Sequence, residues 1–317
     1  MQSDLAFLRD ISDFWGIPCC VLRKDLAVAG SPERVQIRLV LQDEKDRLFL
    51  LEGFRKNLSA AKLRIVNILN YLIAKEIPWI NPYLPGENGQ FFYTGTEYDW
   101  QISAYLAGVA LPRPDYLHDG WRGETTARFA LLLLQPEILP PELANSEPFS
   151  LIRFILDLIE KIKINEPLLY KRLQPVTDYL QSEFFIQHDL LPIKFTHGDL
   201  HPLNIIWSAN SMQAVIDWEF TGLKPFPYDA ANLIGCLGME APQGLLGNFC
   251  RAFLAAFRQG ENFLTPGILF DFVLALRFAW LSEWLRSRDE MMIKLEVDYI
   301  GLLKNNKDLL IKTWDSV

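Results

Sequence analysis

The stretch that organises this chain is residues 195–206, Phe195-Thr196-His197-Gly198-Asp199-Leu200-His201-Pro202-Leu203-Asn204-Ile205-Ile206. A second stretch follows it and reads Ala214-Val215-Ile216-Asp217-Trp218-Glu219-Phe220. Residues 204–207 and 212–217 are apolar runs of strand type, separated by the polar turn 208–211. The two stretches therefore predict a β-hairpin with an Asp, an Asn and a second Asp gathered at one end.

Asp199, Asn204 and Asp217 are the residue types that phosphoryl transfer requires. In that reaction the protein mainly holds a nucleotide, a magnesium ion and an acceptor hydroxyl in line. Asp199 can orient the acceptor hydroxyl and accept its proton, while Asn204 and Asp217 offer hard oxygen ligands for Mg²⁺. Each residue alone is better explained as a turn or capping residue. The ordered set, in a strand-loop-strand context, favours a catalytic loop.

The spacing Asp-x-x-x-x-Asn, followed by apolar-x-apolar-Asp, is the layout of the protein-kinase catalytic loop and its metal-binding Asp. Residues 197–204 and 216–219 resemble the small-molecule branch of that fold: the superfamily of aminoglycoside phosphotransferases, choline kinases, homoserine kinases and N-acetylhexosamine kinases. The protein-kinase branch would read His-Arg-Asp and Asp-Phe-Gly, whereas this chain has Gly198 and Trp218-Glu219. No Ala-Pro-Glu segment follows Asp217, which also disfavours a protein kinase.

The resemblance implies an α+β, protein-kinase-like fold of two lobes. We expect residues 1–103 to form the N-lobe, a five-stranded antiparallel sheet with one main helix, and residues 104–317 to form a mainly helical C-lobe that carries the catalytic-loop hairpin. ATP, or another nucleoside triphosphate, would lie between the lobes with its γ-phosphate over the loop. The strand candidates in the N-lobe are residues 19–22, 35–41, 48–51, 91–93 and 99–103.

Length and composition agree with a large folded chain. The chain has 317 residues, more than one core usually supports, and 50% of them are hydrophobic. It has no apolar run of membrane-spanning length and no signal-peptide pattern at Met1, so we expect a cytoplasmic protein without a membrane partner. The formal net charge of -8 argues against a nucleic-acid partner. The four cysteines, Cys19, Cys20, Cys236 and Cys250, lack metal-ligand spacing, and the adjacent pair Cys19-Cys20 is expected to be reduced and buried.

Residues 29–34 join the first two predicted strands. In the fold that the chain resembles, this turn covers the nucleotide phosphates. Gly30 would allow close approach of the backbone, Ser31 would lie beside it in the nucleotide-binding turn, and Arg34 would be available to a phosphate. Taken alone, the same residues form an ordinary hairpin turn. The resemblance also places a hinge at residues 103–105, where backbone groups near Ser103 and Tyr105 would meet the adenine edge.

The third predicted strand departs from the family pattern. Relatives usually carry a Lys or Arg there, which reaches the nucleotide phosphates and pairs with a Glu on the next helix. Here Glu52, or the leucine before it, stands about where the base belongs. One possibility is a reversed ion pair, with Glu52 on the strand and Lys62 or Arg64 on the helix. Another is that Arg55 or Lys56 contacts the phosphates.

The candidates for acceptor binding lie mainly in residues 271–286. Relatives build their acceptor pocket from C-terminal helices, and four residues share one face at helical spacing here: Arg277, Trp280, Glu283 and Trp284. The alternative is a core helix in which the tryptophans pack and the Arg and Glu pair across a turn. Glu219, two residues after Asp217, is expected either to touch Mg²⁺ through water or only to orient the loop.

Two further residues are expected to support the loop. His197 would fix its geometry through a hydrogen bond, and His201 would do likewise. Asp229 precedes Ala230-Ala231-Asn232 and is predicted to be the N-cap of the next helix and a brace for the loop.

We therefore predict an ATP- and Mg²⁺-dependent phosphotransferase that moves the γ-phosphate to a hydroxyl of a small metabolite. The acceptor classes are sugars, amino sugars, amino alcohols and hydroxy amino acids. The alternative suggested by Glu52 is a nucleotide-binding pseudokinase with a regulatory role, and a protein kinase ranks below both. The sequence leaves open which acceptor is used, whether ATP or GTP is the donor, and the oligomeric state.

Overall fold

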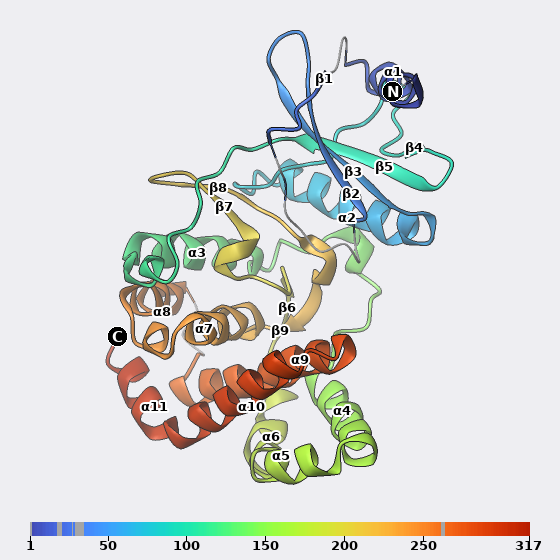
Figure 1. The fold of residues 1–317 in the computed structure, drawn as a ribbon. Coiled ribbons are helices and arrows are strands. Elements are labelled where there is room, and N and C mark those ends of the chain that lie inside the picture. The colour runs from blue at the N-terminus through green and yellow to red at the C-terminus, as the bar shows by residue number, and fades with distance from the viewer. Residues whose placement is uncertain (1, 18–20, 27, 29–34, 261–263) are drawn as a thin grey trace. The chain divides into compact units, whose positions relative to one another are not determined.

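The computed structural model describes residues 2–17, 21–26, 28, 35–260 and 264–317 (Figure 1). Two sequence predictions lie outside these residues: the adjacent cysteines at 19 and 20, and the turn that contains Gly30, Ser31 and Arg34. The chain divides into two compact units. The first consists of Met1–Val109, Pro140–Glu142 and Ile206–Glu219, and the second consists of Ala110–Leu139, Leu143–Ile205 and Phe220–Val317.

A five-stranded antiparallel sheet forms the centre of the first unit, as predicted. Its spatial order is β1-β2-β3-β5-β4. The strands are β1 (Val21–Leu22), β2 (Ile37–Gln42), β3 (Leu48–Arg55), β4 (Tyr93–Thr94) and β5 (Tyr98–Ala104). In the register, Arg38 lies opposite Glu52, and Glu52 lies opposite Gln101. Because side chains of opposed residues project to the same face, these three share one side of the sheet.

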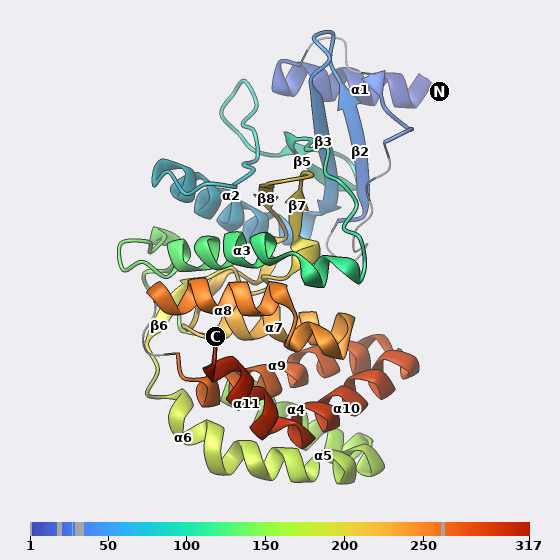
Figure 2. The same cartoon turned by 90° about the vertical axis from the view of Figure 1, so that its left-hand side faces the viewer.

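The other face of the sheet carries the apolar core of this unit. Helix α1 (Gln2–Trp15) lies beside the sheet (Figure 2). It contributes Ile11 and Trp15 to a buried cluster with Leu51 of β3 and Ile102 of β5. Strand alternation sends Glu52 and Phe54 away from that cluster. Helix α2 (Ser59–Ala74) packs on their side, where the ammonium group of its Lys62 lies 5.9 Å from the centre of the Phe54 ring.

The predicted hairpin is present as β7 (Ile205–Trp207) and β8 (Met212–Val215), which form a two-stranded sheet. Residues Ile206–Glu219 belong to the first unit, where Val109 N donates to Trp207 O over 2.8 Å and Val215 N donates to Trp79 O over 2.8 Å. A short 3₁₀ turn, Trp218–Phe220, follows β8. The hairpin is therefore tied to the first unit at both of its strands.

The second unit is mainly helical, as predicted. Strands β6 (Ile193–Thr196) and β9 (Gly222–Pro225) pair in it as an antiparallel two-stranded sheet. Helix α9 is buried along residues 269–278 and apolar nearly all round, which is typical of a helix at the centre of a core. The helices are α3 (Gly120–Leu133), α4 (Leu151–Asn165), α5 (Pro167–Tyr179), α6 (Phe185–His188), α7 (Tyr228–Glu240), α8 (Asn248–Gly260), α9 (Pro266–Ser287), α10 (Glu290–Asn305) and α11 (Lys307–Asp315).

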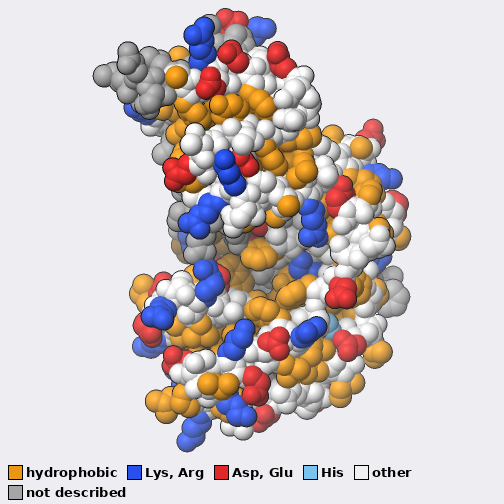
Figure 3. Space-filling model, turned by 90° about the vertical axis from the view of Figure 1, so that its right-hand side faces the viewer, with side chains coloured by type: hydrophobic (Ala, Val, Ile, Leu, Met, Phe, Trp, Pro, Cys, Tyr) orange, Lys and Arg blue, Asp and Glu red, His pale blue; other side chains and the backbone are white. Residues whose placement is uncertain are grey.

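Three observations concern the chemistry of the chain as a whole. Among the described residues, no helix combines the length and the apolar character that crossing a membrane needs. Cys236 and Cys250 are free thiols. On the face drawn in Figure 3, the described basic and acidic side chains are interspersed, so this face presents no continuous basic surface.

Candidate active site

The loop between β6 and the short turn Pro202–Asn204 has a backbone that only glycine fits at residue 198. Gly198 has a φ of 85°, in the left-handed region. A Cβ built there would lie 2.1 Å from the carbonyl oxygen of Phe220. This explains why the chain has glycine where the protein-kinase branch has arginine.

Asp229 holds this loop from helix α7. Its carboxylate accepts hydrogen bonds from the backbone N–H groups of His197 (2.7 Å) and Gly198 (2.8 Å), and the residue is 3% exposed. Burial raises its pKa to about 6, although the two N–H groups and Lys224 favour the ionised form. The predicted N-cap role is wrong. Pro227 is the N-cap of α7, and the Asp229 carboxylate faces the loop instead.

Asp199 lies at the centre of a set of hydrogen bonds within the second unit. Asn204 donates from Nδ2 to Asp199 Oδ2 (3.0 Å) and to the Asp199 carbonyl oxygen (2.9 Å). Asn232 of α7 donates to Asp199 Oδ1 over 3.4 Å and to the carbonyl of Leu200 over 3.2 Å. The Asp199 N–H donates to His197 Nδ1 over 3.2 Å. Both carboxylate oxygens of Asp199 are thus held in a defined orientation.

His201 lies beside Asp199 as a neutral ring. Its Nε2 is 3.8 Å from Asp199 Oδ1, and burial lowers the His201 pKa to about 4. Its Nδ1 accepts from Leu203 N over 3.3 Å, so the proton of the neutral ring is assigned to Nε2, the nitrogen nearer Asp199. His201 therefore supplies an N–H near the carboxylate without adding a positive charge.

Asp217 follows β8, within the first unit, with a φ of 66°. A left-handed conformation is strained for a residue other than glycine, and such strain collects at functional sites. Trp218 fixes the following turn by donating from Nε1 to Val215 O over 3.0 Å. The carboxylates of Glu52, Glu219 and Asp217 all raise the pKa of Tyr83, after burial, which raises it most. Asp217 therefore belongs to an acidic environment around Tyr83.

The residues predicted to hold Mg²⁺ offer suitable atoms. Among the described residues, no group of three or more His, Cys, Asp or Glu side chains forms a preassembled metal site. Asn204 uses its amide nitrogen toward Asp199, and its other polar atom is the oxygen Oδ1. Asp217 supplies a carboxylate. Both are the hard oxygen donors that magnesium prefers, and a Mg²⁺ site commonly keeps waters and substrate phosphates as its remaining ligands.

The charges around Glu52 differ from the reversed pair proposed from the sequence. Glu52 is bonded to Arg38 of β2, at 3.2 Å from Nε to Oε1. Lys62 of α2 is 3% exposed and bonds instead to Glu219 Oε1 at 2.6 Å. The pairing of Glu52 with Lys62 is therefore wrong, because the register of β2 and β3 places Arg38 opposite Glu52. Arg64 is exposed.

The segment predicted to meet adenine forms bonds of its own. Tyr105 N donates to Leu48 O over 2.9 Å, and Ala104 O accepts from Asn81 Nδ2 over 2.9 Å. Ser103 is buried in β5, with its backbone opposite Leu50 of β3. Contact between adenine and Ser103 or Tyr105 stays a prediction, and it would use the remaining backbone groups of this segment.

The candidates on α9 separate into two groups. Arg277 is 2% exposed and makes a bidentate ion pair with the buried Glu296 of α10, at 2.6 and 2.7 Å. Glu283 is exposed and pairs with Arg286. Arg277 and Glu283 are therefore neither paired with each other nor placed in the same environment. The geometry favours a packing role for Arg277.

Trp280 connects α9 to the catalytic loop, and Trp284 packs on Trp280. Trp280 donates from Nε1 to Asn232 Oδ1 over 3.1 Å, and Asn232 in turn bonds Asp199. Trp284 stacks on Trp280 with ring centres 5.9 Å apart and donates to Glu296 over 3.2 Å. Sequence reasoning missed Asn232. The signal was present, since Asp229 and Asn232 stand three residues apart and thus on one face of α7.

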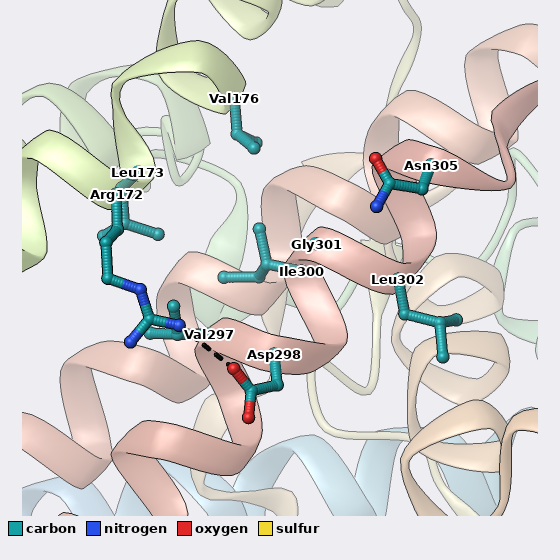
Figure 4. Close-up of a pocket in the computed structure, with 9 residues that line it drawn as sticks. All are labelled: Arg172, Leu173, Val176, Val297, Asp298, Ile300, Gly301, Leu302 and Asn305. Atoms are coloured by element: carbon teal, nitrogen blue, oxygen red, sulfur yellow. Dashed lines mark hydrogen bonds and ion pairs between the residues drawn. The ribbon is translucent and has the colours of Figure 1, made fainter.

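A cavity of 420 Å³ lies elsewhere in the second unit, between α5 and α10 (Figure 4). Its lining is mainly aliphatic, and Arg172 pairs across it with Asp298 at 3.0 Å. None of the residues predicted for catalysis or binding lines it.

Sequence comparison shows which known proteins this chain is similar to. The model of the phosphotransferase enzyme family matches residues 35–263. A homoserine kinase from Rhodospirillum rubrum is 29% identical over 228 residues, which are 68% of this chain and 69% of that protein.

Solved structures confirm the predicted protein-kinase-like fold. Amicoumacin kinase hAmiN, in complex with AMP-PNP, Ca²⁺ and Ami, is similar with a TM-score of 0.66 and 14% identity over 94% of this chain and 93% of its own. The GDP complex of aminoglycoside 2'-phosphotransferase-IIIa has a TM-score of 0.64 and 19% identity over 96% and 99%. A choline/ethanolamine kinase family protein from Mesorhizobium loti has a TM-score of 0.63 and 15% identity over 94% and 93%.

These relatives are small-molecule kinases and phosphotransferases, which confirms the resemblance inferred from the catalytic-loop sequence. At these identities the solved structures establish the fold alone. The family model, by contrast, covers more than half of the chain, and the chain belongs to the phosphotransferase enzyme family.

Proposed function

We propose that this protein transfers the γ-phosphate of ATP, in a Mg²⁺-dependent reaction, to a hydroxyl group of a small metabolite. The observation that carries the proposal is the orientation of the Asp199 carboxylate by Asn204 and Asn232, in a loop fixed by Asp229. A carboxylate held in this way suits an acceptor hydroxyl, because catalysis of phosphoryl transfer depends mainly on positioning.

Each residue of the loop has a role in this proposal. The acceptor oxygen attacks the γ-phosphorus, the bond from that phosphorus to the bridging oxygen of ADP breaks, and the hydroxyl proton passes to the Asp199 carboxylate. Asn204 and Asp217 would hold Mg²⁺ through oxygen atoms. When bound, the metal neutralises charge on the phosphates. His197 keeps the backbone of Asp199 in place through the bond to its N–H.

The acceptor class is proposed from the relatives. Homoserine kinase, the aminoglycoside phosphotransferases and the choline/ethanolamine kinase family act, by their names, on hydroxylated small molecules. We therefore propose a hydroxy amino acid, an amino alcohol, a sugar or an amino sugar as acceptor, and homoserine is the first compound to test. GTP is a donor to test beside ATP, since the aminoglycoside 2'-phosphotransferase-IIIa structure contains GDP.

A nucleotide-binding pseudokinase is the second candidate. The observation in its favour is Glu52, which occupies β3 where relatives are expected to carry a base. In that case the protein would bind nucleotide and Mg²⁺ without phosphorylating any acceptor.

The test combines binding with turnover. The wild-type protein is screened for ADP release with ATP, Mg²⁺ and a panel of hydroxylated metabolites, and nucleotide binding is measured by calorimetry. Asp199→Asn should bind nucleotide with wild-type affinity and lose turnover. Asp157→Asn is the matched control, since Asp157 is an exposed residue of α4.

Three outcomes decide between the candidates. Turnover lost only in Asp199→Asn supports the proposal. Wild-type turnover in Asp199→Asn contradicts the assigned mechanism. Nucleotide binding by the wild-type protein without turnover on any acceptor of the panel supports the pseudokinase.

A further inference from the structure

Three polar side chains form one row across the sheet of the first unit. Arg38 on β2 is opposite Glu52 on β3, and Glu52 is opposite Gln101 on β5. The row lies on the face away from the apolar cluster that contains Leu51. Burying charged side chains costs free energy unless they are hydrogen-bonded or paired, so the contacts of this row indicate its role.

Glu52 is held by three donors. Its Oε1 accepts from Arg38 Nε over 3.2 Å, and its Oε2 accepts from Gln101 Nε2 over 3.0 Å and from Tyr83 Oη over 3.3 Å. The residue is 8% exposed. A buried carboxylate with this number of donors has one orientation available, and it can therefore hold Arg38 in one orientation as well.

Arg38 is bonded to Glu52 through one nitrogen, and its other guanidinium nitrogens are available as hydrogen-bond donors. Its bond to Glu52 uses Nε, and among the described residues the terminal nitrogens Nη1 and Nη2 have no hydrogen-bond partner. Its side chain is 18% exposed. Two adjacent guanidinium nitrogens match two phosphate oxygens in spacing and planarity. Arg38 is thus a cation held in position by Glu52, and its Nη1 and Nη2 groups can donate to a ligand.

Two other cations named from the sequence, Lys62 and Arg55, fit this role less well. Lys62 has a side chain that is 4% exposed, and its ammonium group is bonded to Glu219 at 2.6 Å. Arg55 is exposed at the end of β3, and strand alternation turns it to the opposite face from Glu52.

We propose that Arg38, positioned by Glu52, is the cation that contacts the nucleotide phosphates. In this arrangement the base that contacts the phosphates lies on β2 instead of β3, and the acidic residue that positions it lies on β3. The inference rests on the proposed function, since it requires a nucleotide. It also removes the observation that favours a pseudokinase, because Glu52 then supports nucleotide binding.

The test separates phosphate contact from contact with the rest of the nucleotide. Dissociation constants of adenosine, ADP and AMP-PNP are measured by calorimetry in the presence of Mg²⁺. The phosphate gain is defined as the dissociation constant of adenosine divided by that of ADP. Arg38→Met should reduce this gain about 10- to 100-fold, as expected for the loss of charge-assisted hydrogen bonds, and leave adenosine affinity unchanged. Arg38→Lys should keep part of the gain.

Two further variants separate direct phosphate contact from a change in charge alone. Arg55→Met makes the same chemical change on the opposite face and should keep the wild-type gain. Arg38→Met alone leaves the Glu52 charge unpaired, which could itself repel phosphate. The double variant Arg38→Met/Glu52→Gln removes both charges and should remain as weak toward ADP as Arg38→Met.

The outcomes are distinct. A wild-type phosphate gain in Arg38→Met, or its recovery in the double variant, overturns the assignment. So does loss of the gain in Lys62→Met when Arg38→Met retains it. A wild-type protein that binds no nucleotide instead overturns the proposed function. Unchanged adenosine affinity shows in each variant that the site is folded.

Discussion

Replacing Gly198 with alanine tests whether the geometry of the loop sets the rate of the reaction. An alanine Cβ would lie 2.1 Å from Phe220 O and 2.7 Å from the Phe220 carbonyl carbon. Relieving this clash requires a backbone shift of roughly 1 Å to reach ordinary van der Waals contact. A misplacement of about 1 Å at a reacting group can lower the rate about 100-fold. The φ of 85° adds a cost of about 1–3 kcal/mol for a residue with a side chain.

We therefore expect Gly198→Ala to lower kcat about 100-fold and the free energy of unfolding by about 1–3 kcal/mol. Steady-state ADP release and urea unfolding measure the two quantities. Gly222→Ala is the matched control, because its Cβ would meet only the Lys224 ammonium, at 3.6 Å. A wild-type kcat in Gly198→Ala would refute the claim that this loop must keep its shape.

Three other predictions concern Asp229, Glu296 and Trp280. Because burial raises the pKa of Asp229 to about 6, its stabilising contribution is full below about pH 4 and is lost as the pH rises through 6. The free energy of unfolding of wild type relative to Asp229→Asn should thus fall by about 2 kcal/mol from pH 4 to pH 7, and an equal difference at both pH values would count against it. Glu296→Gln leaves Arg277 buried without its carboxylate and should lower the free energy of unfolding by about 3–5 kcal/mol in urea, while a loss below about 1 kcal/mol would contradict a packing role. Trp280→Phe removes the donor to Asn232 and should lower kcat about tenfold with unchanged nucleotide affinity; unchanged kcat would show that this bond does not position Asp199.

The fold could be predicted because its signals are local and in order along the chain. Strand-type runs separated by turn residues gave the sheet, and the apolar runs on either side of residues 208–211 gave the hairpin of β7 and β8. The catalytic loop was recognisable because the chemistry needs an Asp and an Asn at a fixed spacing within one loop, here Asp199 and Asn204.

Partners across different elements could not be predicted, since they depend on strand register and helix packing. The pairing of Arg38 with Glu52 follows from the register of β2 and β3, which no local pattern specifies. Likewise, Asp229 resembled an N-cap in sequence, but its carboxylate bonds the loop because α7 packs beside it. A short polar residue at a helix start can serve either purpose.

The central claim is that the protein moves the γ-phosphate of ATP onto a hydroxyl group. Phosphorus NMR of the protein with ATP, Mg²⁺ and the acceptor found in the screen tests this claim most directly. The account predicts that the γ-phosphate signal disappears as one new phosphomonoester signal of equal intensity appears, and that Asp199→Asn shows neither change. Conversion of the γ-phosphate to inorganic phosphate alone, or an unchanged spectrum with every acceptor that binds, would contradict it.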